Sequence, residues 1–269
     1  MYKQNIKEKV KERYGKIALL GNVDSCCIPE ECCQVDDDNN TKNDQNRSTS
    51  PIQSSKVIGY DASELELIPQ SSILGVGCGA PTRFAHFKEG DAVVDLGSGA
   101  GIDVSLAAKK VGKPGRVIGI DMTDEMLEKA RNNAKENGYV NVEFRKGDIE
   151  TRIPIENNSI DVVISNCVIN LTTNKVNTFK EVYRILKPDG IGRMIISDLV
   201  TDKEIDKDSI DPDKWCSCID GALTRENYLE SISRAGFSDV KVLEEKLYMN
   251  NENVEGRRIT SLVIKAVKI

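Results

Sequence analysis

The sequence has a single histidine among its 269 residues, and this scarcity limits the chemistry that it can perform. A Ser-His-Asp or Cys-His catalytic arrangement would have to use His86, and no motif around that residue supports one. No apolar run approaches the roughly 20 residues that a helix needs to cross a bilayer. The N-terminus also lacks an apolar core and a small-residue cleavage site, so no secretory signal is predicted.

Basic residues are outnumbered by acidic ones, at 37 Lys and Arg against 43 Asp and Glu, and the formal net charge is −6. No basic stripe stands out, so a phosphate-backbone partner is not expected. We therefore expect a soluble, cytoplasmic protein that acts on a small molecule, with neither a nucleic acid nor a membrane as partner.

Cysteine, by contrast, is plentiful, with eight residues. In a reducing cytosol cysteines are more often metal-binding or catalytic than disulfide-bonded. A buried cysteine taken singly is most often a small hydrophobic residue. Structural zinc is a weaker alternative. Adjacent cysteines are poor tetrahedral ligands, and only one residue separates Cys216 from Cys218, whereas zinc-binding cysteines are usually separated by two to four. The eight are Cys26, Cys27, Cys32, Cys33, Cys78, Cys167, Cys216 and Cys218.

Strand and helix patterns alternate from residue 92 onward, which predicts an α/β fold with a mostly parallel sheet covered by helices on both faces. The expected strands are 92–96, 116–121, 142–146, 160–166 and 190–199, separated by helices at 101–111, 124–137 and 177–186. Further helices are expected at 1–20, 60–67 and 224–235, and two late strands at 240–247 and 260–267.

Composition divides the chain into three expected parts. Residues 1–55 hold the first helix, the paired cysteines and a polar stretch at 35–55, which has too few apolar groups to order itself and is expected to be a mobile linker. Residues 56–200 form the cofactor-binding domain, and residues 201–269 a C-terminal portion.

A glycine-rich loop, Gly97-x-Gly99-x-Gly101, leaves the first of the alternating strands and enters a helix. Glycines let the backbone approach a ligand closely, and a helix N-terminus offers N–H groups. Asp121 ends the next strand 20 residues after Gly101, where a carboxylate can accept both ribose hydroxyls. Asp148 follows the third strand and can take an adenine amino group. Nicotinamide cofactors are the alternative, but their fingerprint needs a glycine where Ile102 stands.

Cys167 directly follows the fourth strand, and ligands of open parallel sheets bind at the carboxyl ends of the strands. Cys167 and the glycine-rich loop should therefore share one cleft. Cys78, at the centre of a second glycine-rich loop, and Cys218 come from segments that could reach the same cleft. Thiolates select soft centres, and three in trigonal geometry suit trivalent arsenic.

The motif Asp95-Leu96-Gly97-Ser98-Gly99 resembles the first motif of class I methyltransferases, which bind S-adenosylmethionine. Gly77-Cys78-Gly79, Ser165-Asn166-Cys167-Val168 and the segment 218–223 resemble arsenite methyltransferases more specifically. This resemblance implies a class I Rossmann-like sheet and a smaller C-terminal α+β portion that contributes to arsenic binding. It also implies methyl transfer from S-adenosylmethionine to trivalent arsenic, supplied as arsenite or its thiol conjugates.

The resemblance also implies roles for individual residues of this sequence, at the positions that match the family's motifs. Cys167 and Cys218 are implied to bind As(III), Cys78 to complete its ligands, and either Cys26 or Cys27 to be a further reactive cysteine. A thiol reductant, either thioredoxin or a glutathione-like small thiol, is implied as co-substrate. Asp220 departs from the family's usual glycine and places a negative charge beside the arsenic loop. The implied cofactor contacts are Asp95, Gly97, Ser98, Gly99, Gly101, Asp121, Met122, Asp148, Ile149 and Asn166.

Two alternatives stay open on the sequence alone. One is a methyltransferase for an organic acceptor such as a quinone or sterol, which would be indifferent to thiol-blocking reagents. The other is a non-catalytic soft-metal binder, for which Asp95, Asp121 and Asp148 would be dispensable.

Overall fold

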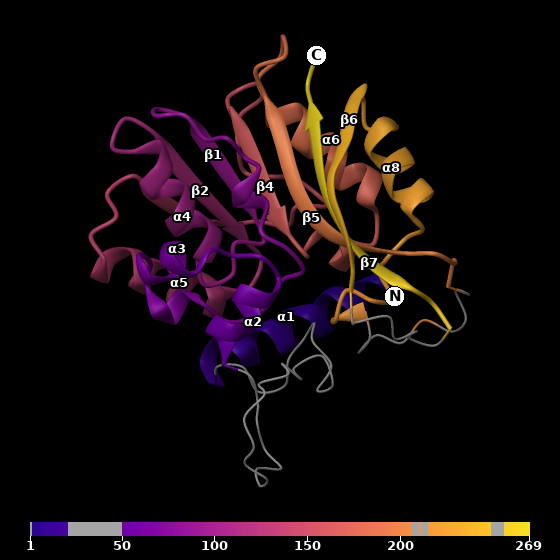
Figure 1. Ribbon diagram of the computed structural model, residues 1–269, viewed down its shortest axis with the longest axis horizontal. Coiled ribbons are helices and arrows are strands. Elements are labelled where there is room, and N and C mark those ends of the chain that lie inside the picture. The colour runs from indigo at the N-terminus through magenta and orange to yellow at the C-terminus, as the bar shows by residue number, and fades with distance from the viewer. Residues whose placement is uncertain (1, 21–49, 206–209, 211–214, 249–255) are drawn as a thin grey trace, which may run out of the picture.

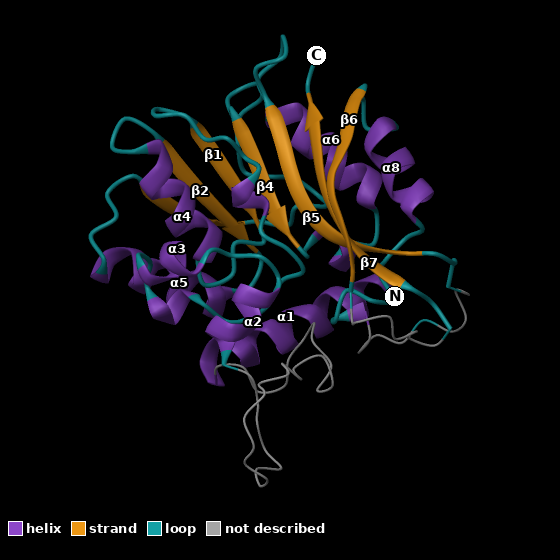
Figure 2. Cartoon of the chain, viewed as in Figure 1, coloured by secondary structure: helices purple, strands orange, loops and turns teal. Residues whose placement is uncertain are grey.

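A seven-stranded sheet forms the centre of the protein, with strand order β3-β2-β1-β4-β5-β7-β6 (Figures 1 and 2). The computed structural model describes residues 2–20, 50–205, 210, 215–248 and 256–269. β1 to β5 are parallel where they pair, and β7 runs antiparallel to both β5 and β6. The strands are β1 Ala92–Leu96, β2 Arg116–Asp121, β3 Val142–Lys146, β4 Val162–Asn166, β5 Arg193–Thr201, β6 Asp239–Leu247 and β7 Ile259–Val267.

The central strands are apolar on both faces because helices cover both. Successive side chains of a strand point to opposite faces, so Val93 and Val94 enter two different cores. The core around Val94 is closed by α6 (Lys175–Ile185) and α8 (Arg225–Ser233), where Phe179 meets Tyr228 edge-to-face at 5.7 Å between ring centroids. The core around Val93 is closed by α4 (Ile102–Val111) and α5 (Asp124–Glu136).

Short elements gather below the carboxyl ends of the parallel strands. Helix α1 (Tyr2–Leu20), drawn in indigo, runs across this edge and packs against α5 (Figure 1). Ile6, Val10 and Ile17 recur along α1 and are buried there. The other short elements among the described residues are α2 Pro51–Val57, α3 Ala62–Glu66, and the 3-10 turns η2 Gln70–Ser72, η3 Pro81–Arg83 and η4 Ile169–Leu171.

The predicted alternation of strands and helices is confirmed, with shifts at some element ends. The prediction of an unstructured linker is wrong for its last residues, because α2 begins at Pro51. Ser50 caps this helix: its Oγ accepts a hydrogen bond from Gln53 N at 3.3 Å, and proline suits the first helical turn. A polar composition can therefore conceal a capped helix. The expected boundary between 55 and 56 falls within α2, and the paired cysteines at 26–27 and 32–33 lie outside the described residues.

The C-terminal strands extend the same sheet, and a buried ion pair joins them to the loop that carries Cys218. Arg257 Nη2, just before β7, lies 2.8 Å from Asp220 Oδ1, and both side chains are almost fully buried. The negative charge that Asp220 brings to the Cys218 loop is thus neutralised by an arginine that precedes β7. In the described part of the chain, no helix combines the length and apolar character needed to cross a membrane.

Removing this ion pair tests whether it anchors the loop. We expect Asp220→Ala to lower the free energy of unfolding by about 3–5 kcal/mol, because it leaves a buried guanidinium without its carboxylate. Denaturant titration followed by circular dichroism measures the change. Asp239→Ala is the matched control, since the pair of Asp239 with Lys241 is solvent-exposed and its loss should cost below about 1 kcal/mol. Equal effects of the two substitutions would contradict the anchoring role.

Candidate active site

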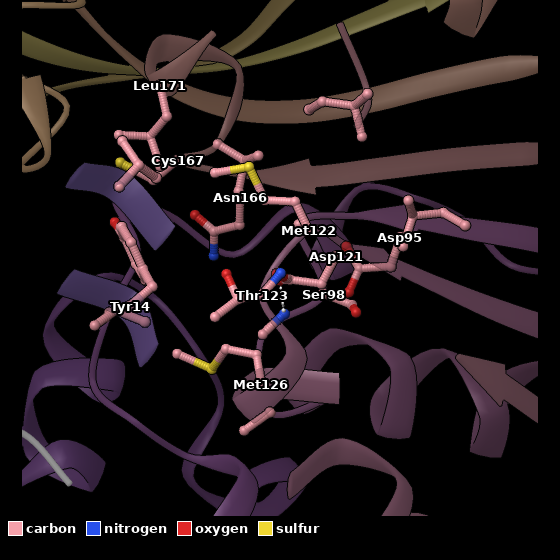
Figure 3. A pocket seen from close by; sticks show the side chains of 18 of the residues that line it. Tyr14, Asp95, Ser98, Asp121, Met122, Thr123, Met126, Asn166, Cys167 and Leu171 are labelled. Carbon is pink, nitrogen blue, oxygen red and sulfur yellow. Dashed lines mark hydrogen bonds between the residues drawn. The ribbon is translucent and has the colours of Figure 1, made fainter. Parts of the chain in front are cut away.

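One cleft opens between the carboxyl ends of β1, β2 and β4 and helix α1. Its empty space is about 1100 Å³ with the mouth included. Figure 3 shows Asp95, Ser98 and Asp121 on one side of this cleft, with Asn166 and Cys167 on another and Tyr14 entering from α1. The glycine-rich loop and Cys167 therefore share a cleft. Further lining residues include Lys7, Val10, Gly97, Gly99, Asp103, Met122, Thr123, Met126, Asp148, Ile149, Val168 and Leu171.

The glycine-rich loop has a backbone that side chains would disturb. Gly97, Gly99 and Gly101 have φ angles of +65°, +52° and +94°, in the left-handed region. A Cβ on Gly97 would lie 2.3 Å from Val168 Cγ2. Ser98 Oγ is buried and has no hydrogen-bond partner in the described part of the chain. A glycine-rich turn that opens a helix fits the nucleoside cofactor implied by the sequence.

Three carboxyl groups face the same cleft: Asp95 and Asp103 are buried, and Asp121 is half-buried. Burial raises the pKa of Asp103 to about 6, although Tyr60 OH donates to its two oxygens at 2.9 and 2.8 Å. Burial, and then the neighbouring Asp103 and Asp121, raise the pKa of Asp95 well above its usual value. Burial raises the pKa of Asp121 as well. Neighbouring carboxyl groups with raised pKa values favour a cationic ligand, because its charge stabilises their ionised forms.

Asp121 ends β2, and Asp148 follows β3. Asp121 is fixed by two backbone amides, since Oδ2 accepts from Gly99 N at 3.0 Å and Oδ1 from Thr123 N at 2.8 Å. Asp148 accepts a hydrogen bond from Lys7 Nζ at 2.7 Å. α1 is thus tied to the acid that the sequence assigns to an adenine amino group.

Cys78 and Cys167 come together at the carboxyl end of β4, beside β5. Their sulfur atoms and a carboxylate oxygen of Asp198 all lie within 4.8 Å of one another. Cys218 packs against this group: its Sγ donates to Cys167 O at 2.9 Å. All three cysteines are buried. Cys167 and Cys218 have φ angles of +58° and +68°, a strained conformation for residues other than glycine and one that clusters at functional sites.

The amide side chain of Asn166 holds the Cys78 loop in place. Asn166 Nδ2 donates to Gly79 O at 2.7 Å, and Asn166 Oδ1 accepts from Cys78 N at 3.1 Å. Nδ2 also donates to Tyr60 OH at 2.9 Å, and Tyr60 in turn bonds Asp103. A continuous hydrogen-bond chain therefore runs from an acid of the cleft to the Cys78 loop.

Gly79 brings that loop against β5. A Cβ on Gly79 would lie 2.1 Å from Ser197 Oγ, so only glycine fits this approach. On the other side, Ser261 Oγ of β7 donates to Cys78 O at 2.5 Å. The loop that carries Cys78 is thus seated on three strands, β4, β5 and β7.

Sequence reasoning missed a buried polar group behind the cysteines. Asp198 Oδ2 accepts hydrogen bonds from Tyr228 OH and Asn170 N, each at 3.0 Å, and burial raises the pKa of Asp198 to about 7. Burial lowers the pKa of Lys175 to about 8, against the attraction of Asp198 and Cys218. The sequence did contain one indication of this group: an aspartate stands within the apolar strand β5, where a buried charge without a partner would be unfavourable.

Comparisons with known proteins agree with this geometry. A methyltransferase-domain family model matches residues 87–236. An arsenite methyltransferase from Halobacterium salinarum is 40% identical over 245 residues, or 89% of this chain and 59% of that protein. The human arsenite methyltransferase is 34% identical over 174 residues, or 61% of this chain and 46% of that protein. The chain thus spans about half to three fifths of the length of these relatives.

A solved structure also shows similarity to an arsenic methyltransferase. The crystal structure of an arsenic(III) S-adenosylmethionine methyltransferase from Chlamydomonas reinhardtii matches with a TM-score of 0.63 at 30% identity, over 83% of this chain and 75% of that one. The fold and the methyltransferase-domain match define a class I S-adenosylmethionine-dependent methyltransferase, as predicted. Within that class, the chain belongs to the arsenite methyltransferase family.

The anchoring role of Asn166 predicts a change in thiol reactivity. Asn166→Ala removes the bonds to both backbone groups of the loop, so we expect Cys78 to be alkylated at least about tenfold faster, since two lost bonds cost roughly 1–3 kcal/mol. Site-resolved mass spectrometry after timed iodoacetamide treatment measures the rate. Asn177→Ala, at an exposed position of α6, is the control and should leave the rate unchanged. An unaltered Cys78 rate in Asn166→Ala would show that the loop is held by other contacts.

Proposed function

We propose that this protein transfers the methyl group of S-adenosylmethionine to trivalent arsenic held by cysteine thiolates. The observation that carries the proposal is the meeting of Cys78 and Cys167 sulfurs at the end of β4, in a cleft shared with the glycine-rich loop. Cys218 packs against Cys167 and is proposed as the third ligand. Membership of the arsenite methyltransferase family supports the choice of arsenic over a quinone or sterol.

The cofactor is proposed to bind along the glycine-rich loop. Asp95 and the backbone of Gly97, Ser98, Gly99 and Gly101 would hold the methionine end, and the buried acids would balance its positive charge. Asp121 and Met122 would receive the ribose, and Asp148 and Ile149 the adenine. Asn166 separates this site from the cysteines, and its amide is already engaged by the Cys78 loop. We therefore assign it a positioning role beside its place in the cleft wall.

Arsenite binding is proposed to proceed by exchange of its hydroxyl groups. Each thiol forms an As–S bond while one As–O bond breaks, and the thiol proton leaves with the hydroxide as water. Bound S-adenosylmethionine supplies an electrophilic methyl group. The arsenic lone pair is the nucleophile, so the chemistry needs alignment rather than a general base, in keeping with a chain that has one histidine.

Methylation leaves arsenic formally pentavalent, and two electrons must return it to the trivalent state. We propose that a cysteine pair supplies them by forming a disulfide, with Cys78 and one of Cys26 and Cys27 as the pair. Thiol exchange with thioredoxin or a glutathione-like thiol would restore the dithiol. The N-terminal cysteines lie outside the described residues, so their part rests on the sequence alone.

The direct test is an incubation of purified protein with methyl-labelled S-adenosylmethionine, arsenite and a thiol reductant. Label recovered on arsenic supports the proposal. Cofactor binding without labelled arsenic would overturn it. Transfer of label to a quinone or sterol would favour the organic acceptor, and stoichiometric arsenic binding without turnover would favour the soft-metal binder.

The thiolate ligands predict a separation of binding from turnover. We expect Cys167→Ser and Cys218→Ser to reduce arsenite methylation at least about a hundredfold, because a hydroxyl is a poor ligand for a soft centre. S-adenosylmethionine affinity, measured by calorimetry, should stay unchanged. Cys216→Ala is the control: Cys216 is buried in a different cluster, with Ile6 and Val10. Full activity in either serine variant would refute the ligand assignment.

The raised pKa of Asp103 predicts how cofactor affinity depends on pH. The ionised Asp103 carboxylate attracts the cationic cofactor. Because its pKa is about 6, the carboxylate becomes protonated as the pH falls below that value. S-adenosylmethionine affinity should therefore be full near pH 8 and weaken below about pH 6, by up to about tenfold per pH unit. Calorimetry across this range measures the effect. Asp103→Asn should bind weakly at every pH with a flatter profile, and an unchanged profile would show that another group is responsible.

A further inference from the structure

The carboxylate of Asp198 is not used by the proposed arsenic chemistry, yet it lies among the proposed ligands. One of its oxygens is within 4.8 Å of both the Cys78 and the Cys167 sulfur atoms. The three side chains are 3%, 4% and 1% exposed, in the order Cys78, Cys167 and Asp198. Two sulfurs and a carboxylate oxygen, from three separate segments, thus converge in a site shielded from water.

This combination of donors suits a different kind of ion from trivalent arsenic. Trivalent arsenic keeps a lone pair and takes three soft ligands in a pyramid. Zn²⁺ has no such lone pair, accepts both thiolate and carboxylate, and takes four ligands as a tetrahedron. Sites that keep one position open use three protein ligands and leave the fourth to water or substrate. Cd²⁺ is a softer ion of the same charge, so the sulfur donors suit it as well.

The carboxylate is already oriented by its surroundings. Tyr228 OH and Asn170 N both donate to Asp198 Oδ2 at 3.0 Å, and Leu199 N donates to Oδ1 at 3.1 Å. A carboxylate has about four lone-pair positions, so three hydrogen bonds leave one for a metal ion. Partners of this kind fix metal-ligating carboxylates in known sites. The nearby Lys175 is the positive charge with which a bound cation would have to compete.

We propose that Cys78, Cys167 and Asp198 form a site for one thiophilic divalent cation, such as Zn²⁺ or Cd²⁺, with Asp198 as the oxygen ligand. The cation and trivalent arsenic would share two sulfurs, so each would exclude the other. Cation binding requires no methyl transfer. Only the mutual exclusion rests on the proposed function.

Cd²⁺ is the probe for the test, because its bond to a thiolate gives an ultraviolet charge-transfer band. Every protein in the series is the full chain carrying Cys26→Ser, Cys27→Ser, Cys32→Ser and Cys33→Ser, which removes binding by the N-terminal cysteines. Competition with a chromophoric chelator gives the Cd²⁺ affinity, and the band intensity reports the number of bound thiolates. We expect one Cd²⁺ per chain, with two thiolates.

Substitutions distinguish Cd²⁺ binding from arsenite binding. Asp198→Asn should weaken Cd²⁺ binding at least about tenfold while arsenite binding persists, since loss of a group that only supports a ligand already costs 10–100-fold. Cys216→Ala, the control, should bind Cd²⁺ like the parent. Arsenite should displace Cd²⁺ stoichiometrically from the parent protein.

Some results would overturn the proposal. Equal Cd²⁺ affinity in Asp198→Asn and its parent excludes the oxygen ligand, and a three-thiolate band that Cys218→Ser reduces assigns the ion to cysteines alone. If Asp198→Asn does not fold, Tyr228→Phe decides: it removes one bond to the carboxylate and should weaken Cd²⁺ severalfold, so unchanged affinity overturns the proposal. Cd²⁺ binding as expected in this series, together with no arsenic methylation by the unsubstituted protein, would refute the proposed function and leave the cation site standing.

Discussion

The Asn166 side chain, at the end of β4, is the contact on which the arrangement of the cleft depends. Its amide bonds both the amide of Cys78 and the carbonyl of Gly79, and so it supplies the backbone partners of a loop outside the sheet. Buried backbone groups need such partners, because each one left unsatisfied costs a few kcal/mol. The same amide reaches Tyr60 and, through it, Asp103. The cofactor side and the cysteine side of the cleft are therefore built on one hydrogen-bonded unit.

Buried charge is the second constraint, and the protein balances it differently in each region. The Asp220 carboxylate meets Arg257 directly, and this pair joins the Cys218 loop to the sheet. Asp95, Asp103 and Asp121 lie near one another in the cleft, with raised pKa values. Ionising these neighbouring carboxyl groups is unfavourable in the empty protein, and a bound cation would offset that unfavourable free energy. The first arrangement stabilises the fold, whereas the second suits binding.

Much of this architecture could be predicted from the sequence. Apolar runs with turn signals gave the parallel strands, and the rule that ligands bind at their carboxyl ends placed Cys167 in the cleft with Gly97 and Asp121. The capped helix at Pro51 was missed, because composition averages over a window while a cap depends on one side chain. The partner of Asp220 was missed for another reason. Arg257 is distant in sequence, and only the antiparallel return of β7 brings the two together.

Asp198 shows most clearly why sequence motifs do not identify every residue of a site. Within β5 it follows Ile195, Ile196 and Ser197, and alternation along the strand indicates only which face it occupies. Its nearness to Cys78 and Cys167 depends on the register between β4 and β5, which pairs Asn166 with Ser197. It also depends on Gly79, whose missing side chain lets the Cys78 loop approach Ser197. Register and close approach are properties of the assembled sheet. A donor set that mixes sulfur and oxygen therefore emerges only in the fold, although each of its members is visible in the sequence.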